Sequence, residues 1–174
     1  MLKIYRLYRK PRFSEILLEK KEIEKGNTIP ADTVIDIILK KFGFTPVQFW
    51  KYILTDVKIY VADPWYNPVT SQDIAIIENA CRSVLKSYEY IQTIFDCDDF
   101  TCVMIGEVSK LRYRYMKNYA FGYCWILLNI DGRVYGHATC FYIDESLRFR
   151  WFEPQLCREI DFDRFDPKPV LIVI

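Results

Sequence analysis

The chain of 174 residues predicts an α+β fold, because helix-forming segments come first and an antiparallel sheet follows them. Apolar residues recur at helical spacing in 34–42 and 74–88, whereas 119–174 is rich in β-prone residues interrupted by turns. Hydrophobic residues make up 51% of the chain and aromatic residues 17%, which indicates an ordered protein with a sizeable core and excludes a disordered chain. We expect a single domain over residues 1–174.

The N-terminal third is expected to be charged and helical. A helix opens at 28–32 and stops at Gly43, and a second short helix is expected over 45–54. We therefore treat residues 1–55 as an N-terminal extension and residues 56–174 as the core, with N-terminal helices packed on an antiparallel sheet.

The core begins with a strand over 57–61. Thr70 or Ser71 then caps a helix whose first turn contains Asp73. One long helix, or two helices meeting near Asp96, is expected over 89–105. Asn129-Ile130-Asp131-Gly132 is a hairpin signal. The remaining expected strands cover 119–128, 134–143, 147–153 and 170–174.

Charge and cysteine usage exclude several classes of protein. With 24 basic and 23 acidic residues, nothing indicates a strongly electrostatic nucleic-acid binder. The six cysteines show no C-x-x-C spacing, and neither a signal peptide nor an apolar run of roughly 18 residues is present. We expect a cytoplasmic, reduced protein with no membrane partner, and the high content of Ile, Lys, Glu and Tyr hints at a thermophile.

The chain has one histidine, His137, with Cys97 before it and Glu153 after it. A thiol hydrolase needs these three groups: a thiolate that attacks a carbonyl, an imidazole that moves the proton, and a carboxylate that fixes the ring tautomer. Each of the three is more often structural than catalytic when it is considered alone. Together they are the candidate catalytic residues.

Hairpin geometry supports the pairing of His137 with Glu153. A three-residue loop over 144–146 pairs Ile143 with Leu147, and this register places His137 directly opposite Glu153 on the same face of the sheet. A symmetric five-residue loop gives the same register. A two- or four-residue loop shifts the pairing by one residue and separates the two side chains.

Two features at the start of the expected helix have opposite effects on ionisation of the Cys97 thiol. The helix N-terminus favours a negatively charged sulfur and offers N–H groups to an oxyanion. Asp96, Asp98 and Asp99 oppose ionisation of the thiol by like-charge repulsion. A hard cation such as calcium, held by carboxylate oxygens, would relieve this repulsion.

Three blocks of sequence resemble one known family. Phe95-Asp-Cys-Asp-Asp-Phe100, Gly136-His-Ala138 and Phe152-Glu-Pro-Gln155 resemble the C-terminal domain of the Marasmius oreades agglutinin and related fungal lectins, a domain also found alone in bacterial and phage proteins. The likeness covers roughly residues 60–160.

The resemblance implies a papain-like fold and a calcium-activated cysteine protease that acts on a protein or peptide substrate. It implies Cys97 as nucleophile, His137 as base and Glu153 as orienting carboxylate, with Asp98 and Asp99 at a calcium site. Gln92, five residues before Cys97, is a candidate for the oxyanion-hole side chain. Thr101 departs from the small residue expected after the acidic pair.

Two other functions stay open on the sequence alone. A non-catalytic structural or interaction protein of a virus or mobile element could retain the fold. Nucleic-acid binding by the alternating basic and aromatic residues of 110–119 is the weaker alternative, because a charged, half-exposed strand gives the same pattern.

Overall fold

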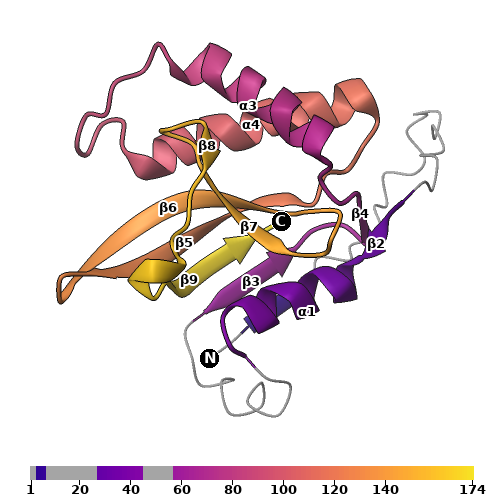
Figure 1. Ribbon diagram of the computed structural model, residues 1–174, viewed down its shortest axis with the longest axis horizontal. Coiled ribbons are helices and arrows are strands. Elements are labelled where there is room, and N and C mark those ends of the chain that lie inside the picture. The colour runs from indigo at the N-terminus through magenta and orange to yellow at the C-terminus, as the bar shows by residue number, and fades with distance from the viewer. Residues whose placement is uncertain (1–2, 7–26, 45–56) are drawn as a thin grey trace.

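The computed structural model describes residues 3–6, 27–44 and 57–174. Three α-helices, a seven-stranded sheet and a two-stranded ribbon make up these residues (Figure 1). The helices are α1 (Ala31–Lys41), α3 (Ser71–Leu85) and α4 (Cys97–Tyr115), followed by a short 3₁₀ helix at Asp163–Phe165. The strands are β1 (Lys3–Arg6), β2 (Ile29–Pro30), β3 (Lys58–Val61), β4 (Trp65–Tyr66), β5 (Phe121–Ile130), β6 (Arg133–Ile143), β7 (Phe149–Glu153), β8 (Arg158–Glu159) and β9 (Lys168–Val173).

The main sheet has the order β1-β3-β9-β5-β6-β7-β8. The pairs β1–β3 and β3–β9 are parallel, and the other four pairs are antiparallel. This mostly antiparallel sheet with helices confirms the expected α+β class at the coarse level. The papain-like form of that class is not shown by the architecture alone.

Helices cover both faces of the sheet (Figure 1). The apolar face of α1 packs on one side, in a core that includes Ile59, Ile126 and Phe141. The α3–α4 pair packs on the other side, over Phe121 and Phe152. Helix α1 therefore shares a core with the C-terminal strands. The helix expected over 45–54 lies outside the described residues.

Local sequence signals explain where these elements begin and end. Thr70 caps α3: its hydroxyl accepts the N–H of Asp73, whose carboxylate accepts the N–H of Thr70. Gly43 adopts a φ of +70° after α1, as the expected helix stop requires. Between β5 and β6, Asp131 and Gly132 have φ of 51° and 78° and form a two-residue turn, which confirms the predicted hairpin.

The register between β6 and β7 differs from the expected one. Ile143 pairs with Phe149, not Leu147, so His137 is not directly opposite Glu153. The side chain of Asp144 accepts the N–H groups of Ser146 and Arg148, and these bonds extend the loop to five residues. Because the shift is two residues, the side chains keep the face that the sequence predicted.

The basic and aromatic segment over 110–119 is also different from expectation. Most of it is the last part of α4 and not a strand. Arg112 turns inward and donates to the carbonyls of Tyr119 and Phe121. The segment therefore does not present an unbroken basic row to a nucleic acid. Among the described residues, no helix has the length and apolar character of a membrane span.

Gly122 on β5 is packed so closely that a methyl group has no room. A Cβ at this position would lie 2.3 Å from the carbonyl oxygen of Val173. We expect Gly122→Ala to lower the free energy of unfolding by about 2–3 kcal/mol. Gly106→Ala on α4 is the matched control, since no atom beyond the backbone of its own helix lies within 4 Å of its Cβ, and helix propensity alone predicts a gain of up to about 1 kcal/mol. Urea unfolding of both variants tests the packing, and equal stabilities would contradict it.

Candidate active site

Cys97 is the first residue of α4 and is half-buried. The carboxylate of Asp99 accepts the N–H of Asp96 at 3.1 Å and fixes the start of the helix. The hydroxyl of Thr101 donates to the carbonyl of Cys97 at 2.8 Å. The sulfur is therefore held at a helix N-terminus, where the helix dipole attracts negative charge.

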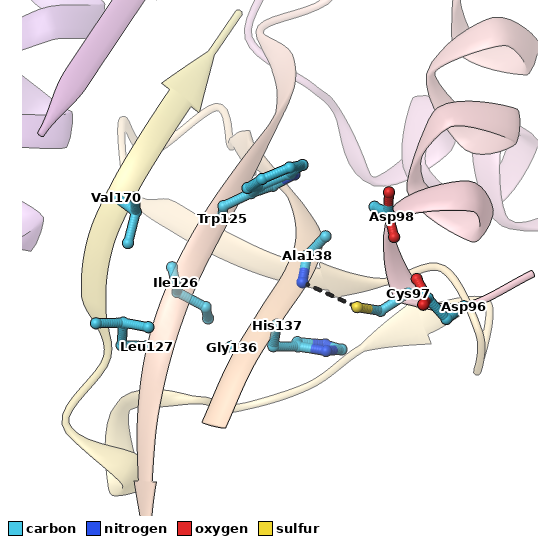
Figure 2. Close-up of a pocket in the computed structure, with 10 residues that line it drawn as sticks. All are labelled: Asp96, Cys97, Asp98, Trp125, Ile126, Leu127, Gly136, His137, Ala138 and Val170. Atoms are coloured by element: carbon cyan, nitrogen blue, oxygen red, sulfur yellow. Dashed lines mark hydrogen bonds between the residues drawn. The ribbon is translucent and has the colours of Figure 1, made fainter. Parts of the chain in front are cut away.

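The sulfur faces an edge of the main sheet that is free of a neighbouring strand. Strand β7 pairs with β6 only from Cys140 to Ile143, so the preceding part of β6 has no partner from β7. There the N–H of Ala138 donates to the Cys97 sulfur at 3.4 Å (Figure 2). A short β7 thus leaves one backbone donor for the thiol.

His137 lies between Cys97 and Glu153. Its Nε2 lies 2.7 Å from Oε2 of Glu153. Since Nε2 is taken by the carboxylate, Nδ1 is the ring nitrogen that remains for the thiol, which lines the same cavity as the ring. Figure 2 shows the sulfur beside the ring. The structure therefore brings together all three residues that the sequence selected.

Charge on His137 is favoured by its two partners. Burial opposes the imidazolium, but the interactions with Cys97 and Glu153 outweigh it and raise the pKa of His137 to about 9. The ring also packs against Phe162, with ring centroids 5.4 Å apart. This arrangement can keep a proton on the imidazole at neutral pH.

Glu153 is 5% exposed and its carboxylate is fully engaged. Oε1 accepts the N–H of Gln155 at 3.0 Å. Oε2 contacts the His137 ring and lies 3.3 Å from the hydroxyl of Thr139, which also lies 2.9 Å from the carbonyl of Phe152. Sequence reasoning missed Thr139, although its position two residues after His137 places both on one face of β6. The carboxylate is held in one orientation against the ring.

A cavity of about 360 Å³ opens beside the sulfur and the imidazole. Its far wall is apolar and comes from β5 and β9, which carry Trp125, Leu127 and Val170 (Figure 2). These three side chains are partly exposed, at 45%, 40% and 39% respectively. The reactive groups therefore face a groove with room for a substrate.

The acidic residues next to Cys97 divide into two roles. Ligand atoms of Asp96, Cys97 and Asp98 lie within 4.8 Å of one another. The interaction between the two carboxyl groups raises the pKa of Asp98 and lowers the pKa of Asp96. Asp99, the second expected ligand, instead accepts the Asp96 N–H.

This donor set does not by itself fit calcium. Calcium takes six to eight oxygen ligands, whereas the cluster offers two carboxylates and a sulfur. Calcium binding by Asp98 and Asp99 stays a prediction from the sequence. Gln92 lies exposed in the turn before Phe95 and does not line the cavity, so its role at an oxyanion also stays a prediction.

The raised pKa of His137 predicts a pH-dependent stability. The folded pKa of about 9 is above the ordinary value of 6.5, so the folded state holds the proton more tightly. This contribution is complete below pH 6.5 and is lost as the pH rises to about 9, for a total of at most roughly 3 kcal/mol. Urea unfolding from pH 6 to 10 measures it. The difference between the wild type and His137→Gln should shrink across this window, and parallel profiles would reject the assignment.

Comparisons with known proteins identify the fold. No family model matches the chain, and no curated protein matches it. The solved structure of the PSL1a–E64 complex, a lectin of Polyporus squamosus, aligns with a TM-score of 0.60 at 22% identity, over 84% of this chain and 51% of that one. Polyporus squamosus lectin bound to the human-type influenza-binding epitope Neu5Aca2-6Galb1-4GlcNAc aligns with a TM-score of 0.57 at 22% identity, over 84% and 49%. The chain spans about half the length of these neighbours.

These neighbours correct the classification that the resemblance implied. Both are lectins, which points away from a papain-like, calcium-dependent cysteine protease as the class of this chain. They lend no support to a viral, phage-related or thermophilic source. At 22% identity the likeness shows the fold alone, and it agrees with the sequence resemblance only in that the neighbours are lectins.

Proposed function

We propose that the protein is a thiol-dependent hydrolase that cleaves a peptide or isopeptide bond, with Cys97 as its nucleophile. The observation that supports this most directly is the chain of contacts from Glu153 through His137 to Cys97, which ends at an open cavity. The inference depends on these side chains and not on the class of the neighbours.

The first half of the reaction forms an acyl-enzyme. Nδ1 of His137 holds the thiol proton while the sulfur attacks the substrate carbonyl. The imidazolium then gives this proton to the leaving amine. Glu153 accepts the Nε2–H, which fixes the tautomer and stabilises the charged ring.

Two backbone donors next to the sulfur are suited to the developing oxyanion. The N–H of Cys97 has no acceptor within its own helix, because it belongs to the first turn of α4. The N–H of Ala138 already points at the sulfur. Removing one such donor typically costs about 10²–10³ in rate in other hydrolases, so backbone donors alone supply a substantial effect.

The second half of the reaction returns the enzyme to its starting state. A water molecule enters the open groove, and Nδ1 of His137 removes its proton as the oxygen attacks the thioester. The acid product leaves and the thiol takes back its proton. The groove wall of Trp125, Leu127 and Val170 supports a preference for a bulky apolar side chain next to the cleaved bond.

A peptide library tests this function. We expect the wild type to generate new peptide termini from a proteome-derived library, enriched in bulky apolar residues beside the cleaved bond. Cys97→Ala should lower their number at least about 10³-fold, since the nucleophile is lost. Mass spectrometry counts the termini, and Cys102→Ala, which removes an exposed thiol of the same helix, is the control.

A second candidate is a non-catalytic binding domain that retains the fold. The observation that favours it is the naming of both structural neighbours as lectins. Under this alternative, the wild type and Cys97→Ala would give the same termini, and the apolar groove would serve only to bind a ligand. That result would overturn the hydrolase proposal.

A further inference from the structure

A pair of sulfur atoms lies away from the Cys97 sulfur of the proposed reaction. Cys81 on α3 and Cys157 in the turn between β7 and β8 have their Sγ atoms 3.1 Å apart. This is about 1 Å more than the length of a disulfide bond. Cys81 is 0% exposed and Cys157 is 6% exposed, and neither contacts the Cys97 sulfur.

Both thiols converge on one carbonyl. The Pro154 oxygen lies 3.7 Å from the Cys81 sulfur and 3.3 Å from the Cys157 sulfur. Arg82 donates to the Cys157 carbonyl at 3.4 Å. The two sulfurs are therefore held against each other by the backbone around them and do not meet by chance rotation of exposed side chains.

The turn that carries Cys157 also positions Glu153. The N–H of Gln155 in this turn donates to the Glu153 carboxylate. Cys157 itself adopts the left-handed conformation, with φ of 49°, which a residue other than glycine adopts only at some cost. A covalent bond here would tie α3 to the segment that orients the carboxylate.

We propose that Cys81 and Cys157 form a reversible intramolecular disulfide, with a low-molecular-weight disulfide such as oxidised glutathione as the oxidant. Cys157 reacts with the oxidant first, because its turn reaches the surface at Leu156, which is 47% exposed. Cys81 is enclosed and acts second.

The exchange balances in two steps. The Cys157 thiolate attacks oxidised glutathione, forming a mixed disulfide and releasing one glutathione thiolate, which takes up a proton. The Cys81 sulfur then attacks the Cys157 sulfur, gives up its own proton and releases the second glutathione. Two protein thiols are oxidised, and one glutathione disulfide is reduced to two thiols.

The bond should stabilise the fold. It joins residues that are 76 positions apart, and crosslinks that close long loops remove much of the entropy of the unfolded chain. The sulfurs need to approach by only about 1 Å, so the native geometry changes little. We expect the oxidised protein to melt at least about 5 °C above the reduced protein.

Glutathione titration of the Cys97→Ala protein tests the proposal without using the proposed active site. After incubation over a range of reduced to oxidised glutathione ratios, free thiols are blocked, and non-reducing peptide mapping identifies the disulfides. We expect one Cys81–Cys157 disulfide, with the rise in melting temperature reversed by dithiothreitol.

Two cysteine variants and reduction by dithiothreitol serve as controls for this titration. Cys157→Ala should form no such bond and show no oxidant-dependent rise in melting temperature, whereas Cys102→Ala should keep both effects. If Cys157→Ala folds poorly, the dithiothreitol reversal in the parent protein still decides. Cys81 and Cys157 remaining free at every ratio, or a disulfide that leaves the melting temperature unchanged, would overturn the proposal. Because Cys97 is absent throughout, neither outcome bears on the hydrolase proposal.

Discussion

Replacing His137 with glutamine is expected to slow hydrolysis about 10³-fold, because the chain loses its only imidazole and the proton transfers of both half-reactions. Glutamine can fill part of the space and still hydrogen-bond to Glu153, so the fold should survive. The ratio kcat/KM for a peptide selected from the library measures the effect. The loss should fall mainly on kcat, since the imidazole acts on the reacting bond and not on remote binding.

Tyr135→Gln is the matched control for this variant. Tyr135 lies two residues away on the same face of β6 and is 46% exposed, with no place in the proposed chemistry. We expect it to change kcat less than about threefold. A similar loss of kcat in both variants would mean that the effect comes from disruption of β6 and not from loss of the imidazole.

Two substitutions at Glu153 should separate its role in orienting the His137 ring from its contribution to the stability of the fold. Glu153→Ala removes the partner of His137 and leaves the Gln155 N–H without its acceptor, whereas the Thr139 hydroxyl keeps the Phe152 carbonyl. Breaking a buried pair of this kind costs about 3–5 kcal/mol. We therefore expect urea unfolding to show a loss of about 3 kcal/mol together with a loss of hydrolysis.

Glu153→Gln should retain more stability and still lose hydrolysis. The amide can donate to Nε2, which favours the tautomer with its proton on Nδ1, and that nitrogen can then no longer accept the thiol proton. We expect a fall of about 10²–10⁴ in kcat. Glu159→Gln on β8 is the control, because Glu159 bonds to Tyr142 and not to the ring. Normal hydrolysis by Glu153→Gln would show that the carboxylate does not set the tautomer.

Local signals in the sequence were sufficient for much of the fold. The Thr70 cap and the Asp131-Gly132 turn depend on residues close in the chain, and both form as predicted. The β6–β7 register does not follow from such signals, because the side chain of Asp144 decides the loop length through two backbone bonds. A two-residue shift nevertheless preserved the shared face of His137 and Glu153.

The sequence predicted the reacting groups of the site, but not the strand edge and the packing that surround them. A single histidine limited the choice of base, and the order of Cys97 and Glu153 around it suggested the rest. The free edge at Ala138 depends on the β6–β7 register, which the sequence did not specify, although the end of β7 at Glu153 was expected. The meeting of Cys81 with Cys157 depends on how α3 packs against a distant turn. Long-range packing of this kind leaves no periodic trace in the chain.

The most direct test of the account is the order in which the six cysteines react. With limiting iodoacetamide near pH 7, peptide mass mapping should show Cys97 modified at least about tenfold faster than Cys102, the exposed thiol whose pKa is raised by partial burial and by nearby Asp98 and Asp99. His137→Gln should remove this advantage. Equal rates at Cys97 and Cys102 in the wild type would contradict an activated thiol at the start of α4.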